Sequence, residues 1–399
     1  MRILIANANR QVVGGAETYL QALVPALEAA GHEAALLYER EAPNGAAAVD
    51  SASPRMPRWS AAGTRETDAL GAVAQWRPTV AYVHGLASPT LERSLLDRMP
   101  CVLFAHGYYG TCATGTKRHA WPTATPCHRR IGVACLALHY PRRCGGWSPV
   151  AAVESYRRQR ERFRLLGRYR SICVASRHMR EEYLRHGLPS PVVQVTPLPP
   201  SGVMRDPTLA PGAAGSGQVV YVGRVTDLKM APNAVDAVAR AARRLGRKLS
   251  LEILGEGPAL PAVAARGKEL GMSLAVRAWV DATTRNAVLR SSELLLVPST
   301  WPEPWGLVGL EAACVGLPSV GYAVGGIPEW LIAGETGELA PGDPPTTEGL
   351  AQAITRALND PPHYQRLRRG AWEQVARFTM ERHLNALLPV LEDAGRTVT

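Results

Sequence analysis

The chain has 399 residues, of which 46% are hydrophobic and 20% are charged, and at roughly 150 residues per domain this length predicts two or three globular domains. The composition excludes an intrinsically disordered, collagen-like or coiled-coil protein. The net charge of +11 indicates an acidic partner.

Strands and helices alternate through the first half of the chain. Arg2 to Asn7 has the pattern of an apolar strand, and Gly14-Gly15 opens an amphipathic helix. Further strands are predicted over 34–38, 80–84, 102–105 and 172–175, and such alternation predicts parallel βαβ units in an α/β domain over residues 1–198. Residues 110–150 break this rhythm with Gly, Pro, Cys and His, which predicts an irregular insertion.

The Pro- and Gly-rich residues 199–217 have no apolar periodicity and predict an interdomain linker. The alternation then restarts and predicts a second α/β domain over residues 218–375. Residues 376–399 are helical in pattern. Two α/β halves of similar size predict a cleft between them, which is a usual place for a ligand.

The excess positive charge lies in one block of the sequence. Residues 101–200 carry 16 basic and 4 acidic side chains, whereas the rest of the chain is nearly neutral. The centre of the block is a predicted helix with Arg157, Arg158, Arg160 and Arg164. A solvated helix face is one explanation, and a face for an acidic acceptor or an anionic membrane is the functional alternative. No nucleic-acid recognition motif accompanies the block, so we expect no nucleic-acid partner.

The sequence has no targeting or membrane-spanning segment that we recognise. No apolar run approaches the roughly 18 residues of a membrane span, and the N-terminal MRILIANANR lacks the pattern of a signal peptide. We therefore expect a cytoplasmic protein, with peripheral contact at the inner membrane face as an extension of the charge argument.

Five of the seven cysteines lie between Cys101 and Cys144. The odd total without an export signal argues against a disulfide framework. A structural metal site is one alternative for four of them and free thiols are the favoured one, although the spacing lacks the tight Cys-x2-Cys pairs typical of zinc sites. These four are Cys112, Cys127, Cys135 and Cys144.

Glycine-containing turns follow several predicted strands and are candidates for anion binding. Gly14-Gly15 precedes a helix whose N-terminal N–H groups attract anions, although a plain tight turn explains it equally well. After the first strand of the second half, Arg224 and Lys229 are two cations that suit a diphosphate if they are not simply solvated. The turn Gly255-Glu256-Gly257-Pro258 lacks the third glycine of the dinucleotide fingerprint.

Residues 298–318 are the most informative segment. Glu303 lies in a Pro-rich loop, a helix is predicted to begin at Gly306-Leu307, and Glu311 follows among apolar residues. A buried carboxylate must be paired or hydrogen-bonded. Glu311 is therefore in a structural salt bridge or bound to a ligand.

The order of these motifs, from Gly-Gly-Ala-Glu through Gly-Arg…Lys, Gly-Glu-Gly-Pro and Glu-x7-Glu to Gly-Gly-Ile-Pro-Glu, resembles glycosyltransferase family 4. The resemblance implies the α/β GT-B fold: two Rossmann-like domains facing each other across a cleft, the first on the acceptor side, with the C-terminal helix crossing back to it. It implies a retaining transfer of a sugar from a UDP- or GDP-linked donor to a hydroxyl of a glycan, a lipid-linked glycan precursor or a small metabolite. No cofactor is expected, and no Asp-x-Asp motif occurs, which is consistent with Arg and Lys replacing a catalytic metal.

The resemblance also assigns residues by motif. Trp279 stands where the family often has a small residue before the nucleobase loop, so it either stacks on the base or narrows the pocket. Family members are thought to react on one face of the sugar without an enzymic nucleophile, so we expect none here. A nucleotide-sugar epimerase of the same fold and a non-catalytic nucleotide-sugar-binding protein are the alternative functions. The implied contacts are His106 and Glu303 at the transferred sugar, Arg224, Lys229, Gly15, Leu307 and Val308 at the diphosphate, and Glu311 at the ribose.

Overall fold

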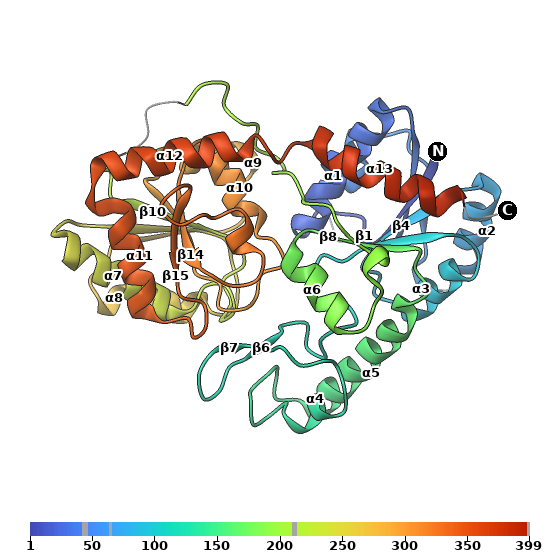
Figure 1. Cartoon of the computed structure of the whole chain (residues 1–399), viewed down its shortest axis with the longest axis horizontal. Helices are drawn as coiled ribbons and strands as arrows, with labels where there is room; N and C mark the ends of the chain where they lie inside the picture. Colours follow the sequence, from blue (N-terminus) through green and yellow to red (C-terminus); the bar gives the residue numbers. More distant parts are fainter. Residues whose placement is uncertain (42–46, 64–65, 210–213, 397–399) are drawn as a thin grey trace.

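The computed structural model describes residues 1–41, 47–63, 66–209 and 214–396. It consists of two α/β domains that lie side by side, and the chain passes between them twice (Figure 1).

The first domain is built on a parallel seven-stranded sheet with the order β3-β2-β1-β4-β5-β8-β9. Its inner strands are mostly apolar and buried, as expected for a parallel sheet with helices on both faces. The strands are β1 (Arg2–Asn9), β2 (Glu33–Arg40), β3 (Arg58–Ser60), β4 (Val80–His84), β5 (Cys101–Phe104), β8 (Ser171–Val174) and β9 (Val193–Val195). The helices are α1 (Gly15–Ala29), η1 (Val49–Ala52), α2 (Glu66–Trp76), α3 (Pro89–Leu96), α5 (Pro149–Leu166), α6 (Arg177–Arg185) and η3 (Ser190–Val192).

The irregular insertion lies between β5 and α5. It contains only short elements: β6 (Arg118–His119), β7 (Thr125–Pro126) and α4 (Ala134–Ala137). In Figure 1 these elements form a lobe at the bottom of the view, away from the strands of the first sheet.

The second domain repeats the same topology. Its six parallel strands have the order β12-β11-β10-β13-β14-β15, so that in both sheets the order reverses beside the first strand, where ligands of α/β proteins bind. The strands are β10 (Gln218–Val222), β11 (Ser250–Leu254), β12 (Leu274–Arg277), β13 (Leu294–Val297), β14 (Ser319–Tyr322) and β15 (Gly337–Ala340). The helices are α7 (Pro232–Leu245), α8 (Leu260–Glu269), α9 (Ala282–Ser291), α10 (Leu307–Cys314), η4 (Ile327–Glu329), α11 (Thr347–Asn359) and α12 (Pro361–Val375). The predicted fold class is confirmed.

Two segments connect the domains. The described part of 199–217 contains neither helix nor strand, and residues 210–213 of this expected linker lie outside the described residues. The last helix, α13 (Met380–Arg396), crosses back onto the first domain (Figure 1). There it contacts β4, β5 and α1, and Gly395 packs closely against Thr79.

No helix in the described ranges is both long enough and apolar enough to cross a bilayer.

Candidate functional site

An ion pair between a half-buried lysine and a buried glutamate joins two of the residues proposed for the donor. The Nζ atom of Lys229, in the loop after β10, lies 3.0 Å from Oε1 of Glu303, in the loop after β13. Ser299 donates a hydrogen bond of 2.8 Å to the same carboxylate oxygen. Since β10 and β13 are neighbours in the sheet, their carboxyl-terminal loops bring the cation and the carboxylate together.

Close packing of two glycine turns shapes the loop that carries the cations. A Cβ atom on Gly255 would lie 2.0 Å from the carbonyl oxygen of Gly223, and one on Gly257 would lie 2.1 Å from that of Val225. Only glycine permits this approach, and both residues have positive φ angles. The side chain of Arg224 is exposed, so of the two predicted cations Lys229 points to Glu303 and Arg224 lies at the surface of the loop.

Two helix N-termini from different domains approach each other. A Cβ atom on Gly15, the first residue of α1, would lie 3.5 Å from Cδ1 of Leu307, the first residue of α10. Neither helix has a side chain capping its N-terminus, so the first N–H groups of both remain available to an anion. The structure thus brings Gly15 close to Leu307, and the assignment of Gly15, Leu307 and Val308 to the diphosphate stays a prediction.

Two side chains of the first domain hold the loop that contains Glu303 by donating hydrogen bonds to the backbone carbonyl groups of that loop. The Tyr108 hydroxyl donates to the carbonyl oxygen of Pro302 over 2.6 Å, and the Ser176 hydroxyl donates to that of Pro304 over 2.7 Å. Sequence reasoning missed Tyr108 and Ser176 as site residues. Their positions just after β5 and β8, at the carboxyl edge of the sheet, were the available signal.

His106 lies in a buried chain of polar rings. Its Nε2 atom is 2.9 Å from Nδ1 of His84. The Tyr19 hydroxyl is 2.7 Å from Nε2 of His383, whose Nδ1 donates to the carbonyl oxygen of Pro197 over 2.9 Å. Burial lowers the pKa of His106 to about 3 and that of His383 to about 4. His106 is therefore neutral near pH 7, and it is suited to hydrogen bonding rather than to proton transfer.

This burial predicts a loss of stability on mild acidification. In the unfolded chain His383 has a pKa near 6.5, so between that value and about 4 the unfolded state binds the extra proton. Stability from His383 is therefore full above about pH 6.5 and is lost as the pH falls, with a slope approaching 1.4 kcal/mol per pH unit. Between about pH 6.5 and about pH 5 the urea-unfolding free energy of the unchanged protein should fall by about 1.5 kcal/mol on account of His383, and we expect His383→Gln to remove this part of the fall. An unchanged pH dependence in the variant would contradict the assignment.

Glu311 is buried with a cationic partner. Its Oε2 atom lies 3.6 Å from Nη1 of Arg285, on α9. Burial raises the pKa of Glu311, and the Arg285 charge opposes that shift. The structure thus contains the salt bridge considered as the alternative, and the ribose assignment stays a prediction. Trp279 is 76% exposed, in the loop between β12 and α9.

The remaining candidates lie in the first domain. Arg157, Arg158 and Arg164 are exposed on α5, whereas Arg160 is half-buried, with its guanidinium carbon 5.7 Å from the centre of the Phe163 ring. Exposed arginines are compatible with either explanation of the basic block.

None of the four cysteines of the insertion is in a disulfide. Burial, followed by the neighbouring thiols of Cys127, Cys112 and Cys135, raises the pKa of Cys144 to about 11. Across the described part of the chain, no group of three or more His, Cys, Asp or Glu side chains is placed to hold a metal ion. The choice between a structural metal and free thiols for these cysteines stays a prediction.

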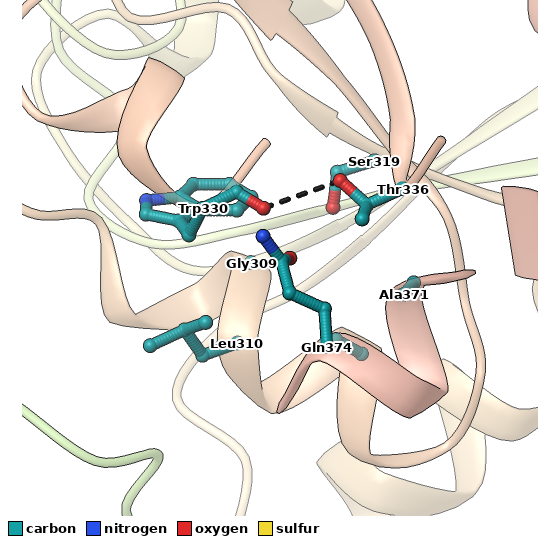
Figure 2. Close-up of a pocket in the computed structure, with 8 residues that line it drawn as sticks. Gly309, Leu310, Ser319, Trp330, Thr336, Ala371 and Gln374 are labelled. Atoms are coloured by element: carbon teal, nitrogen blue, oxygen red, sulfur yellow. Dashed lines mark hydrogen bonds between the residues drawn. The ribbon is translucent and has the colours of Figure 1, made fainter. Parts of the chain in front are cut away.

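A small cavity beside α10 supports the site rather than binding a ligand. Its volume is about 10 Å³, which is room for about one water molecule. Figure 2 shows Trp330 beside Gly309 of α10, where a Cβ atom would come within 1.9 Å of the indole ring. Because the Trp330 indole N–H donates to the carbonyl oxygen of Trp305 over 2.6 Å, the ring fixes the backbone just before α10.

Comparisons with known proteins agree with this geometry. Residues 13–199 match the family described as Glycosyltransferase Family 4, and residues 212–374 match Glycosyl transferases group 1. Glycogen synthase of Mycobacterium tuberculosis H37Rv is 29% identical over 354 residues, which cover 82% of this chain and 75% of that protein. D-inositol 3-phosphate glycosyltransferase of Saccharomonospora viridis is 33% identical over 189 residues, 44% of this chain and 42% of that protein.

Solved structures share the fold at low sequence identity. Anabaena Alr3699/HepE, in complex with UDP and glucose, superposes with a TM-score of 0.68 at 15% identity, covering 98% of this chain and 100% of that one. Sucrose-phosphate synthase of Thermosynechococcus elongatus superposes with a TM-score of 0.71 at 18% identity, covering 98% and 99%.

Proposed function

Because this chain belongs to the family 4 type of glycosyltransferases with the GT-B fold, we propose that it transfers a sugar from a nucleoside-diphosphate sugar to a hydroxyl acceptor, with retention of configuration and without a catalytic metal. The observation that carries the proposal is the Lys229–Glu303 pair at 3.0 Å. One member has the charge to bind a diphosphate, and the other can accept hydrogen bonds from sugar hydroxyls. In a nucleoside-diphosphate sugar, the diphosphate and the sugar hydroxyls lie on either side of the anomeric carbon.

The charges of the site suit the departure of a diphosphate. Negative charge develops on the leaving group while the sugar becomes oxocarbenium-like. Fixed positive groups placed at that charge lower the barrier because they need no reorganisation. Arg224, Lys229 and the N-terminal amides at Gly15, Leu307 and Val308 are such groups.

We assign neither Glu303 nor His106 to proton transfer. Glu303 is already bound by Lys229 and Ser299, so we assign it to holding sugar hydroxyls rather than to nucleophilic attack. His106, held neutral by burial, serves as a hydrogen-bonding partner of the sugar.

We propose a glycan or lipid-linked glycan precursor as the acceptor, with a small metabolite as the alternative. The glycogen synthase relative supports a glycan. UDP-glucose is the first donor to test, because the Anabaena structure contains UDP and glucose, and GDP-sugars come next.

The test measures donor turnover in three arms. Nucleotide sugars are first screened by thermal shift, and nucleoside diphosphate release is then followed with glycan acceptor, without acceptor, and with acceptor plus EDTA. We expect acceptor-dependent release that EDTA leaves unchanged, and an anomeric configuration in the product equal to that of the donor by NMR. Conversion of the donor to its sugar epimer without acceptor and without net release of nucleoside diphosphate, followed by NMR, would favour an epimerase, and binding without turnover would favour a non-catalytic protein. Loss of activity in EDTA would overturn the metal-free mechanism.

A further inference from the structure

The insertion between β5 and α5 exposes an unusual amount of large apolar surface. Nine large hydrophobic side chains are exposed among the residues that the structure describes; four of these lie in the insertion and a fifth lies at the start of α5. These five are Trp121, Val133, Tyr140, Trp147 and Val150. Because contiguous exposed apolar groups mark interaction sites, the insertion is a candidate docking surface.

Three of the aromatic side chains form an organised cluster around one arginine. The guanidinium carbon of Arg143 lies 4.7 Å from the centre of the Trp121 ring and 5.8 Å from that of Trp147. The rings of Tyr140 and Trp147 are stacked, with centres 6.2 Å apart and planes 24° apart. Trp121, Tyr140, Arg143 and Trp147 are called the aromatic–arginine cluster below.

The backbone is constrained to build this cluster. Arg143 has a φ angle of 48°, a left-handed conformation that non-glycine residues rarely adopt and that the surroundings must enforce. The Trp121 N–H donates to the carbonyl oxygen of Arg142 over 3.2 Å, so the backbone at Trp121 is joined directly to the segment that carries Arg143.

The charged residues in the sequence around the cluster are all basic. From Arg98 to Val153 the chain contains seven basic residues and no acidic residue. Arg129, Arg130, Arg142 and Arg143 are all exposed, and α5, which follows directly, adds the exposed Arg157 and Arg158. The surface therefore complements an anionic partner.

The combination of side chains favours a lipid surface over a soluble glycan. Arg143 and Tyr140 lie near the ring of Trp147, and Trp147 is still 71% exposed and free to enter a headgroup layer. The exposed valine side chains cannot form hydrogen bonds with a hydroxylated ligand. Trp and Tyr with adjacent basic residues are instead typical of the water–bilayer boundary, where the rings sit at headgroup level.

We propose that the insertion docks the protein on an anionic bilayer, with the aromatic–arginine cluster at headgroup level and the surrounding arginines over the acidic headgroups. This surface belongs to the insertion and not to the loops around Glu303, and its test needs no catalytic activity. Its failure would therefore leave the proposed function untouched.

The experiment is vesicle flotation of the full chain with phosphatidylcholine alone and with equal parts phosphatidylcholine and phosphatidylglycerol. We expect about tenfold or greater enrichment on the anionic vesicles, reduced when salt is raised from about 0.1 M to about 0.5 M. Trp121→Ala/Trp147→Ala is expected to lower binding at both salt concentrations. Arg129→Gln/Arg130→Gln is expected to lower it mainly at low salt.

The matched controls are Trp279→Ala, which removes an exposed Trp from the second domain, and Arg243→Gln, which removes an exposed cation from α7. Both should float like the unchanged protein, and thermal melts should show that every variant is folded. Negligible binding to both vesicle types would overturn the proposal. It would also be overturned if the controls lost as much binding as the cluster variants, or if the cluster bound soluble glycans but not vesicles.

Discussion

Replacing Arg224 with alanine or Glu303 with glutamine is expected to lower kcat by about 10²- to 10³-fold, the effect of removing one preorganised charge-stabilising group from an active site. Arg224 acts on the charge that develops on the diphosphate, so its loss raises the barrier more than it weakens donor binding. Glu303→Gln keeps the shape of the side chain but removes the charge that Lys229 meets at 3.0 Å. The measurement is kcat and KM for donor, taken with saturating acceptor.

The control for Arg224→Ala is Arg243→Ala, because Arg243 is equally exposed but lies on α7. Its kcat should equal that of the unchanged protein. Urea unfolding separates a chemical effect from a folding defect, since Glu303 is buried and hydrogen-bonded to Ser299. Near-normal turnover in either site variant, with the donor saturating, would refute the assignment.

The fold was predictable because its determinants are local. Parallel strands covered on both faces appear as short apolar runs, and the helices between them carry an apolar stripe. Residues 80–84, for example, were predicted as a strand from such a run and form β4. The glycine turns were predictable for the same reason, because a close backbone approach such as that of Gly255 requires glycine at that one position.

The contacts that complete the site were not predictable because they join residues far apart in sequence. Tyr108 and Pro302 are 194 residues apart, and Ser176 and Pro304 are 128 apart. No local pattern records that a hydroxyl from one domain will meet a carbonyl group of the other. The same holds for His84 beside His106 and for Arg285 beside Glu311. The motif resemblance identified His106 and Glu311, but only the folded chain shows that His84 and Arg285 lie beside them.

Replacing Glu182 with alanine is expected to cost about 3–5 kcal/mol in the free energy of unfolding, because it leaves a buried ammonium group without its counter-charge. Nζ of Lys117 lies 2.7 Å from Oε1 of Glu182, and the two side chains are 3% and 2% exposed. Burial raises the pKa of Glu182, and Lys117 opposes that shift. Lys117 belongs to the insertion and Glu182 to α6, so this pair fastens the insertion to the first domain. Urea unfolding at neutral pH measures the effect.

A double variant separates the loss of attraction from the cost of an unpaired charge. Lys117→Met/Glu182→Leu removes both charges and should recover most of the stability, because apolar side chains of similar size need no counter-charge. Glu161→Ala is the surface control. Glu161 meets Arg93 at 2.6 Å with both side chains well exposed, and such pairs contribute about 1 kcal/mol or less. A double variant no more stable than Glu182→Ala would mean that the stability comes from the shape of these side chains. The insertion would then be held by packing and not by charge.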